Sequence, residues 1–281
     1  MQILDGKALS KKIEAEVAEG VKKLKSETGR VPGLAVILVG NDPASHAYVG
    51  MKKKACDRVG FYSVTHEMPE TISQEAIEQT IDMMNKNPNI DGILIQLPLP
   101  KHIDTTRLLE IVAPQKDVDG FHPYNVGRLA TGLDGFVPCT PLGVMELFAE
   151  YGIDVKGKDA VVVGASDIVG KPMAALLLNA NATVTVTHIY TKDLAAHTRN
   201  ADIVLVGAGV IGLIKEDMVK EGAIVIDIGI NRNKEGRLVG DVDFENVSKK
   251  CSYITPVPGG VGPMTIAILL KNTLKAAQAD S

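Results

Sequence analysis

The sequence predicts an α/β protein of two domains, and three observations lead to this prediction. Continuous apolar runs alternate with segments whose apolar residues recur at helical spacing, which is typical of mainly parallel sheets. The chain has 281 residues, which is room for about two domains. Prolines and glycines concentrate at 114–143, where we place a linker. We expect a first domain at 1–138, completed by a C-terminal helix at 264–281, and a second at 139–263.

The individual elements follow from the period of the apolar residues. The run at 34–39 is apolar at every position, which suits a strand buried on both faces. In the first half we expect helices at 9–24, 44–59, 74–84 and 105–112, and strands at 34–39, near 62–64 and at 92–95. In the second half we expect helices at 141–151, 171–179 and 264–277, and strands at 160–163, 183–187, 203–206 and 224–228.

Composition and charge exclude several classes of protein. The chain is 45% hydrophobic and 23% charged, which is ordinary for a globular protein. Its net charge of −4, with acids and bases mixed, offers no basic face for nucleic acid. The first residues lack the order of a signal peptide, and no uninterrupted apolar run is long enough for a membrane helix. We therefore expect a cytoplasmic protein with no nucleic-acid or membrane partner.

We expect no metal. The cysteines Cys56, Cys139 and Cys251 are far apart and form no Cys-x-x-Cys pattern, so neither a disulfide framework nor a zinc site is indicated. Two Asp-x-Asp pairs, Asp117/Asp119 and Asp241/Asp243, have no third ligand at matching spacing. A better use of Asp119 is to hold a polar edge of a ligand, whereas Asp241 and Asp243 are interpreted as loop and cap residues.

Tyr48 and Lys52 are the first candidate functional pair. They stand four apart in an expected helix, so their side chains share one face. An aromatic ring and an amine placed in this way can stack on a flat heterocycle and move a proton beside it. Gln96 stands where the apolar strand at 92–95 stops, and strand ends are where α/β folds bind ligands. The alternative is a packed ring and a solvated ammonium, with no ligand.

A second candidate is a strand, a glycine-bearing turn and a helix start at 161–170. Gly164 permits a sharp turn, Ser166 offers a hydroxyl, and Gly170 lets helix and strand approach. A phosphate would sit at the helix N-terminus, so the segment indicates dinucleotide binding. The end of the strand at 183–187 has neither the acid typical of an NAD site nor an arginine typical of an NADP site. The choice of cofactor stays open.

Several ordered motifs resemble one family, the bifunctional methylenetetrahydrofolate dehydrogenase/cyclohydrolases, over essentially the whole chain. The residues that carry the resemblance are Ser45-x-x-Tyr48-x-x-x-Lys52-x-Lys54-Ala55-Cys56, Gln96-Leu97-Pro98-Leu99-Pro100, Lys116-Asp117-Val118-Asp119-Gly120, Pro138-Cys139-Thr140-Pro141, Val163-Gly164-x-Ser166-x-Ile168-Val169-Gly170-x-Pro172, Asp227-x-Gly229-x-Asn231, Gly240-Asp241-Val242 and Thr255 to Thr265.

The resemblance implies an N-terminal α/β folate-binding domain, a Rossmann-like dinucleotide-binding domain with a parallel sheet, a folate cleft between them and a homodimer. It implies oxidation of 5,10-methylenetetrahydrofolate to the methenyl form with NAD(P)⁺, and hydrolysis of that form to 10-formyltetrahydrofolate. These reactions supply one-carbon units for syntheses such as that of purines.

The resemblance also implies roles for individual residues. The catalytic set would be Lys52 with Tyr48 stacking on folate, Gln96 partnering the lysine and Asp119 holding the pterin edge. The substrate-binding residues would be Tyr48, Val49, Gly50, Met51, Lys52, Ile95, Gln96, Leu97, Asp119, Pro258, Gly259, Gly260, Val261 and Gly262. The cofactor-binding residues would be Thr140, Gly164, Ala165, Ser166, Ile189 and Ile230.

Two departures from the family pattern concern the cofactor. Ala165 stands where the family commonly has arginine, and Ile189 where it commonly has serine, and both family residues contact the 2′-phosphate of NADP. The cofactor is therefore NADP or NAD. Two rival functions remain: a dehydrogenase of an amino or hydroxy acid, which would need an arginine clamp for the carboxylate, and a non-catalytic nucleotide-binding protein, which would not need Lys52.

Overall fold

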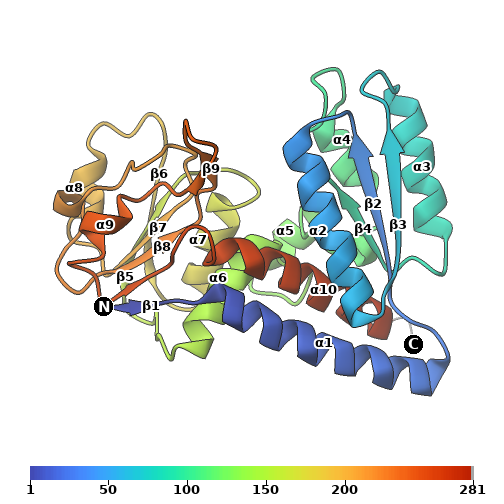
Figure 1. Cartoon of the computed structure of the whole chain (residues 1–281), viewed down its shortest axis with the longest axis horizontal. Coiled ribbons are helices and arrows are strands. Elements are labelled where there is room, and N and C mark those ends of the chain that lie inside the picture. Colours follow the sequence, from blue (N-terminus) through green and yellow to red (C-terminus); the bar gives the residue numbers. More distant parts are fainter. Residues whose placement is uncertain (280–281) are drawn as a thin grey trace. The chain divides into compact units, whose positions relative to one another are not determined.

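The computed structural model describes residues 1–279, which divide into two compact units (Figure 1). Unit 1 consists of Met1–Ser10, Leu129–Gly132 and Pro138–Thr265. Unit 2 consists of Lys11–Arg128, Leu133–Val137 and the chain from Ile266 onward. The helices that contain residues of both units are α1 (Gly6–Thr28), α5 (Pro123–Ala130) and α10 (Val261–Ala279).

Unit 2 is built on a three-stranded sheet in the order β3-β2-β4, in which both pairings are parallel. Its strands are β2 (Gly33–Val39), β3 (Tyr62–Met68) and β4 (Gly92–Ile95), and the helices that alternate with them are α2 (Pro43–Val59), α3 (Gln74–Lys86) and α4 (Thr105–Ile111). The predicted α/β alternation of the first half is confirmed, and β3 is longer than the short run we expected.

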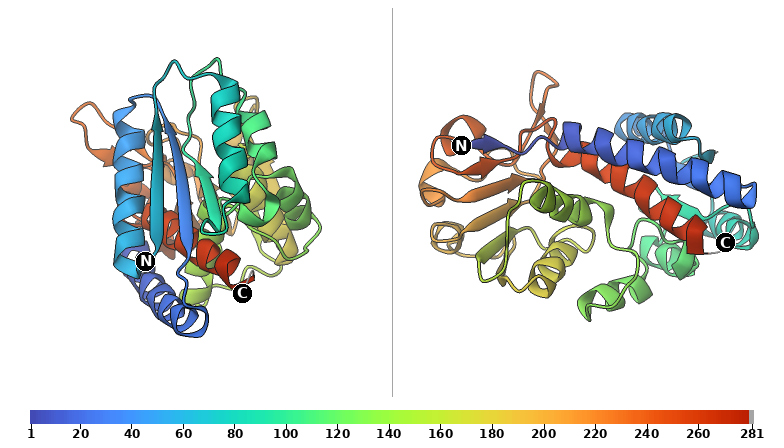
Figure 2. Two further views of the ribbon diagram at one scale, coloured as in Figure 1. Left: turned by 90° about the vertical axis from the view of Figure 1, so that its right-hand side faces the viewer. Right: turned by 90° about the horizontal axis from the view of Figure 1, so that it is seen from below.

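The core of unit 2 depends on the alternation of side chains along β2, in which every second residue points to the same face of the sheet. Every residue of this strand is buried, and Ala35, Ile37 and Val39 point to one face, where they share a hydrophobic cluster with Ile77 and Ile81 of α3. The helices α1 and α10 lie side by side (Figures 1 and 2). Gly20 permits this approach, since a Cβ there would lie 2.5 Å from a Leu274 methyl group.

Helix α2, which carries Tyr48 and Lys52, has a defined start and end. The Asp42 carboxylate accepts hydrogen bonds from the Ser45 N–H and hydroxyl, both at 2.8 Å, and these bonds lower the pKa of Asp42. At the other end Gly60 adopts the left-handed conformation with φ of 83°. Both caps fix the register of the helix and hence the face on which Tyr48 and Lys52 lie.

Unit 1 is built on a six-stranded sheet in the order β1-β11-β8-β7-β5-β6, with parallel pairing throughout. The strands are β1 (Gln2–Ile3), β5 (Asp159–Val163), β6 (Thr183–Thr187), β7 (Ile203–Val206), β8 (Ile224–Asp227) and β11 (Tyr253–Ile254). The remaining elements are α6 (Cys139–Glu150), α7 (Gly170–Asn179), α8 (Leu194–Thr198), η2 (Glu216–Met218), α9 (Phe244–Val247) and the antiparallel pair β9 (Asn231–Arg232) and β10 (Leu238–Val239).

The strands β5 to β8 match the four segments predicted for the second half to within one residue, and the parallel sheet is confirmed. One core cluster is formed by side chains of β5, β7 and β8 together with Val242, Val247 and Ile254. The sequence did not reveal β1 and β11, because two residues are too few to display a period. Through β1, which pairs with β11, residues 1–10 pack within unit 1.

Residues 114–143, which we predicted to be a linker, contain regular structure. They include the 3₁₀ turn η1 (Pro114–Lys116), α5 and the start of α6. The prolines that suggested irregular chain stand at helix starts: Pro114 opens η1, Pro123 opens α5, and Pro141 lies in the first turn of α6. A proline is tolerated there because its missing N–H would have had no partner within the helix.

Candidate functional site

Lys52 and Gln96 meet within unit 2. The Lys52 Nζ donates a hydrogen bond of 3.0 Å to the Gln96 Oε1. Gln96 follows directly after the buried strand β4, and its Nε2 donates to the Leu97 carbonyl at 2.7 Å. That second bond orients the amide so that its oxygen faces the amine. The half-buried lysine is thus held by a neutral acceptor and not by a carboxylate.

The other predicted residues of this segment occupy different environments. Tyr48 is half-buried one turn before Lys52, and Val49 and Ile95 belong to the core. Gly50 lies two residues from both Tyr48 and Lys52, which turns it to the other side of the helix. A Cβ on Gly50 would meet no atom within 4 Å, so there is open space beside this residue.

Asp119 stands on a loop whose preceding residues are firmly held. Lys116 is buried, and its Nζ donates to the carbonyl groups of Met84 at 3.1 Å and Asn87 at 2.8 Å, at the end of α3. The Val118 carbonyl accepts a hydrogen bond of 2.9 Å from Asn272 Nδ2 of α10. Asp119 itself is half-buried.

Asp117 stabilises the same loop through hydrogen bonds to its side chain. Its buried carboxylate accepts hydrogen bonds from Phe121 N at 3.1 Å, His122 N at 2.8 Å and Asn125 Nδ2 at 2.8 Å. Burial raises the pKa of Asp117 to about 6. The two carboxylates of the Asp-x-Asp pair therefore differ in environment, since one ties the loop together while the other has a partly exposed side chain. The sequence alone did not distinguish the structural role of Asp117.

In unit 1 the turn after β5 has no room for side chains at its glycines. Gly164 has φ of 117°, and a Cβ there would lie 2.4 Å from the Gly207 carbonyl oxygen. A Cβ on Gly170 would lie 2.0 Å from the Gly164 carbonyl oxygen. The Ser166 hydroxyl accepts hydrogen bonds from Val169 N at 3.2 Å and Gly170 N at 3.4 Å. This tight turn, which leads into α7, suits the phosphate groups of a dinucleotide.

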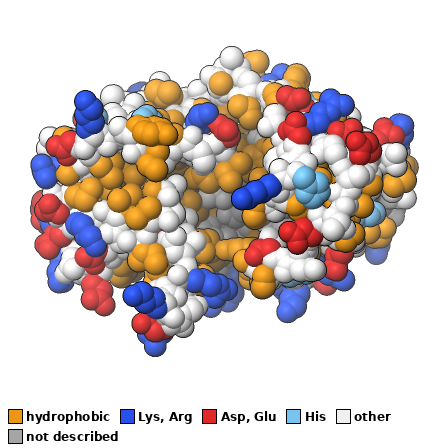
Figure 3. Space-filling model, turned by 90° about the horizontal axis from the view of Figure 1, so that it is seen from above, with side chains coloured by type: hydrophobic (Ala, Val, Ile, Leu, Met, Phe, Trp, Pro, Cys, Tyr) orange, Lys and Arg blue, Asp and Glu red, His pale blue; other side chains and the backbone are white. Residues whose placement is uncertain are grey.

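Exposed apolar side chains follow the carboxyl ends of four neighbouring strands in unit 1. Ile168 follows β5, Ile189 follows β6, Ile211 follows β7 and Ile230 follows β8, and Ile189 is 91% exposed. We call these four residues the apolar rim. Orange side chains also gather on the part of unit 1 visible in Figure 3. Ligands of doubly wound sheets bind at this edge, and exposed apolar groups there suit the flat rings of a nucleotide.

The remaining predicted residues of unit 1 lie around the start of α10. The Thr140 and Thr265 hydroxyl oxygens are 2.8 Å apart, and Ile230 Cδ1 lies 3.4 Å from where a Gly262 Cβ would be. The segment Pro258 to Gly262 is held to the start of α1, because Lys7 N donates to the Gly259 carbonyl at 2.9 Å. This segment belongs to unit 1, whereas Lys52, Gln96 and Asp119 belong to unit 2.

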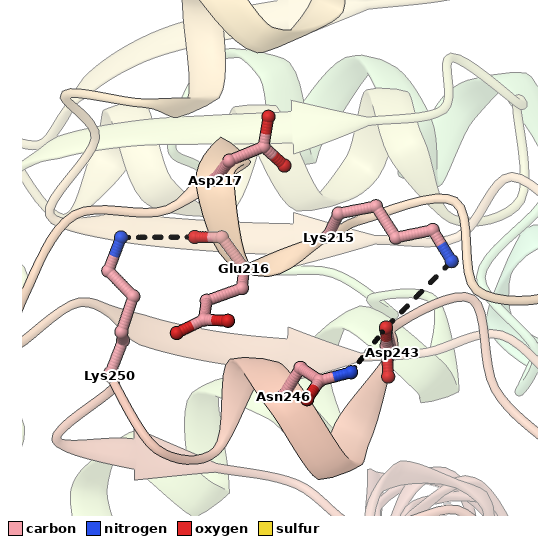
Figure 4. Close-up of a pocket in the computed structure, with 6 residues that line it drawn as sticks. All are labelled: Lys215, Glu216, Asp217, Asp243, Asn246 and Lys250. Carbon is pink, nitrogen blue, oxygen red and sulfur yellow. Dashed lines mark hydrogen bonds and ion pairs between the residues drawn. The ribbon is translucent and has the colours of Figure 1, made fainter.

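A separate pocket on unit 1 contains none of the predicted residues. It is lined by Lys215, Glu216, Asp217, Asp243, Asn246 and Lys250 (Figure 4). Lys215 Nζ lies 3.9 Å from the Asp243 carboxylate, and Lys250 Nζ donates to the Glu216 carbonyl at 3.0 Å.

Among residues 1–279 no group of three or more His, Cys, Asp or Glu side chains is placed to hold a metal ion. Within the same range no helix is long and apolar enough to cross a membrane.

A half-buried lysine–glutamine pair on one α/β unit and a glycine turn with an apolar rim on the other are features of a dinucleotide-dependent enzyme. Comparisons with known proteins identify the family. Residues 4–119 match the family described as tetrahydrofolate dehydrogenase/cyclohydrolase, catalytic domain, and residues 138–281 match its NAD(P)-binding domain. The bifunctional protein FolD of Sulfurimonas denitrificans is 79% identical, over 100% of this chain and 99% of the relative.

Solved structures agree with the sequence comparison. The bifunctional enzyme FolD of Campylobacter jejuni superposes with a TM-score of 0.99 at 57% identity, covering 100% of both chains. The FolD of Trypanosoma brucei, complexed with NADP cofactor and inhibitor, has a TM-score of 0.95 at 42% identity, covering 99% of this chain and 97% of that one.

The chain therefore belongs to the tetrahydrofolate dehydrogenase/cyclohydrolase family. It is a bifunctional enzyme of one-carbon folate metabolism with methylenetetrahydrofolate dehydrogenase and methenyltetrahydrofolate cyclohydrolase activities, and it uses a nicotinamide cofactor. The two rival functions that the sequence left open, a different dehydrogenase and a non-catalytic binding protein, are excluded.

Proposed function

We propose that Lys52 is the proton-transferring residue of the cyclohydrolase reaction and that Gln96 orients it. The observation that carries this proposal is the 3.0 Å hydrogen bond from the Lys52 amine to the Gln96 amide oxygen. Tyr48 stacks on the folate, and Asp119 accepts hydrogen bonds from the edge of the pterin. The contacts to folate come from residues 48–52, Ile95, Gln96, Leu97, Asp119 and Pro258 to Gly262.

The chemistry places different demands on the protein in the two reactions. When bound, the nicotinamide cofactor would supply the hydride-accepting group for oxidation of the methylene carbon to the methenyl cation. No protein base is required for this step, so the residues act by positioning. In the cyclohydrolase reaction water attacks the methenyl carbon and the bond from that carbon to N5 breaks. Lys52 accepts one proton of the attacking water and delivers it to N5, and the second proton passes to solvent as the hydroxyl group becomes the formyl carbonyl.

The hydrogen bond to Gln96 suits this role of Lys52. A carboxylate partner would stabilise the charged ammonium and oppose its loss of a proton. An amide oxygen fixes the position of the amine with a smaller electrostatic effect, and the amide is itself fixed by its bond to the Leu97 carbonyl. The amine is therefore oriented by a neutral group, as a residue that both accepts and donates a proton requires.

On unit 1 the cofactor contacts in this proposal are Thr140, Gly164, Ala165, Ser166, Ile189 and Ile230. The tight glycine turn and the apolar rim support it. Because Ala165 and Ile189 carry no hydrogen-bond donor in their side chains, we propose that the enzyme uses NAD at least as readily as its relatives do, with weakened preference for NADP. We also propose a cytoplasmic homodimer on the basis of the family, and sedimentation equilibrium would test the dimer.

Replacement of Lys52 tests the proposed catalytic role. Lys52→Met keeps much of the volume of the stem and removes the proton-transferring group. We expect the cyclohydrolase rate to fall by about 10²–10⁴-fold, the usual contribution of a positioned acid or base, while a folate analogue binds with nearly unchanged affinity. Lys53→Met is the matched control, because Lys53 is exposed on the same helix. Hydrolysis of methenyltetrahydrofolate by Lys52→Met at the wild-type rate would show that the assignment is wrong.

A further inference from the structure

Two carboxylates that are almost completely buried lie at the carboxyl end of β8. Asp227 is the last residue of this strand, and Asp241 follows β10. The Asp227 carboxylate accepts three backbone hydrogen bonds of 3.0 Å each, from Gly229 N, Asp241 N and Val242 N. One buried side chain therefore joins the chain after β8 to the chain after β10.

Asp241 makes a second set of bonds to the neighbouring loops. Its Oδ2 accepts from Ala208 N at 2.7 Å and Gly209 N at 2.8 Å, and its Oδ1 accepts from Asn231 Nδ2 at 2.8 Å. Ala208 and Gly209 lie in the loop after β7, and Asn231 lies in β9. We call Asp227 and Asp241 together the carboxylate clasp.

Two glycines make room for the clasp in a reciprocal way. A Cβ on Gly240 would lie 1.9 Å from Asp227 Oδ2, and a Cβ on Gly229 would lie 2.3 Å from Asp241 Cγ. The Asp227 carboxylate thus packs on the backbone of Gly240, which directly precedes Asp241. The Asp241 carboxylate packs on the backbone of Gly229, two residues after Asp227. Any larger residue at either position would displace a carboxylate, since both contacts are far shorter than van der Waals distance.

The clasp holds the loops that carry half of the apolar rim. Strands β7 and β8 are parallel neighbours, with Val206 paired to Asp227, so the loops that follow them leave the same edge of the sheet. Ile211 belongs to the first loop, and Ile230 stands between Gly229 and Asn231, both of which bond to the clasp. Ile230 and Ile211 are themselves exposed.

We propose that the carboxylate clasp is a positioning device for the nicotinamide nucleotide: Asp241 holds the loops 207–211 and 228–231 in the conformation that binds the nucleotide, and so serves the dehydrogenase reaction but not the cyclohydrolase reaction. This inference rests on the proposed placement of the nucleotide at the carboxyl edge of unit 1. The cyclohydrolase reaction needs no nucleotide, and Lys52 and Gln96 lie in unit 2.

Asp241 is a better position than Asp227 for a substitution that tests this inference. The Asp227 N–H donates to the Thr255 hydroxyl at 2.7 Å, and Thr255 begins the segment that leads to Pro258 and Gly262. A change at Asp227 would therefore disturb residues proposed to contact folate. Asp241→Asn keeps the shape of the side chain but removes its charge and places an amide N–H₂ among N–H donors. Asp243→Asn makes the same chemical change two residues away, where the side chain contacts Lys215 and Asn246 instead.

The experiment measures both activities and nucleotide binding on the full chain. For Asp241→Asn we expect the Kd of NAD and of NADP, measured by calorimetry, to rise at least about tenfold, which corresponds to about 1.4 kcal/mol. The dehydrogenase KM for the nucleotide should rise in parallel, while the hydrolysis of methenyltetrahydrofolate stays within about twofold of the wild type. Asp243→Asn should leave all three quantities unchanged.

Asn231→Ala is the second variant, and it decides the question if Asp241→Asn does not fold. It removes one of the three donors to Asp241 and leaves the buried carboxylate in place, so we expect a smaller rise in both nucleotide Kd values. Unchanged nucleotide affinity in the variant that folds overturns the inference, as does an equal loss of both activities. If wild-type protein binds neither NAD nor NADP, the proposed cofactor site itself fails, which is a distinguishable result.

Discussion

At the scale of single residues, Ala165 and Ile189 bear on the choice of cofactor. Ile189 is 91% exposed after β6, and the turn that follows is closed by a 3.0 Å bond from His188 N to the Thr191 hydroxyl. Of the nearby cations, Arg199 is engaged, since its Nε donates to the Asp217 carbonyl at 3.0 Å. Lys192 is exposed close to the turn and is the remaining cation that we consider for a 2′-phosphate.

We predict that wild-type enzyme shows a lower ratio of kcat/KM with NADP to that with NAD than its relatives do. Ala165→Arg combined with Ile189→Ser should raise this ratio at least tenfold, because hydrogen bonds to a charged group contribute roughly 1.5–3 kcal/mol each. Steady-state kinetics with both cofactors on one preparation measures the ratio. Ala196→Arg, which adds the same charge on the exposed part of α8, is the control. A wild type strongly selective for NADP contradicts the prediction and directs attention to Lys192.

At the scale of elements, the loop from Lys116 to His122 holds the backbone around Asp119, which we propose to bind the edge of the pterin. Lys116 anchors the loop to the end of α3, and Asp117 anchors it to the start of α5 through the His122 N–H and Asn125. Three consecutive buried residues thus precede the half-buried Asp119. A carboxylate that must meet a planar ligand edge gains from such a fixed backbone, because less conformational entropy is lost on binding.

We predict that substitutions of the two carboxylates of this loop affect different properties. Asp119→Asn should weaken the binding of a folate analogue by about tenfold or more, since charge-assisted hydrogen bonds contribute roughly 1.5–3 kcal/mol, with little change in melting temperature. Asp117→Asn should lower the melting temperature and affect folate binding less, because an amide N–H₂ then faces three N–H donors. Calorimetry and thermal melts on both variants measure these effects. Equal effects on folate affinity would refute the assignment of Asp119.

Local features of the sequence predicted a large part of the candidate site. The spacing of Tyr48 and Lys52 depends only on the helical period, and the turn at Gly164 depends only on a strand followed by a helix. The resemblance supplied Gln96 as a partner of Lys52, and the structure places the two side chains in hydrogen-bond contact. The assigned catalytic role of that contact remains a prediction.

Features that depend on tertiary structure did not follow from the sequence. Asp227 and Asp241 meet only because the chain after β8 returns through β9 and β10, so no local pattern joins them. Asp241 lies in a loop, as predicted, but the sequence does not show that its buried carboxylate bonds to three partners. The identity of Gly229 and Gly240 is the available signal, because a glycine within two residues of an aspartate in each motif indicates a close approach of the backbone.

At the scale of the whole molecule, each unit contains a buried carboxylate with a raised pKa. Burial is the main cause in both cases, and it raises the pKa to about 6 for Asp117 in unit 2 and for Asp227 in unit 1. The carboxylates of Asp42, Asp134 and Asp202 show the opposite shift, because hydrogen bonds from Ser45, Lys275 and Lys220 lower their pKa values. The two groups of acids therefore affect stability in different ranges of pH.

We predict that stability falls as the pH rises from about 4 to about 6. In this window the native protein keeps a proton on Asp117 and Asp227 that the unfolded chain, with carboxyl pKa values near 3.9, has lost. Each shift of about two pKa units corresponds to at most about 3 kcal/mol. The acids with lowered pKa values lose their stabilising effect only below this window. Melting temperatures of wild type and Asp117→Asn between pH 4 and 7 measure the effect, and the advantage of the wild type should be largest at the acid end.

If the two units melt separately, both transitions of the wild type should shift to lower temperature as the pH rises. In Asp117→Asn only the transition of unit 2 should lose this dependence on pH. A difference between wild type and variant that stays constant with pH would show that Asp117 does not titrate in this range.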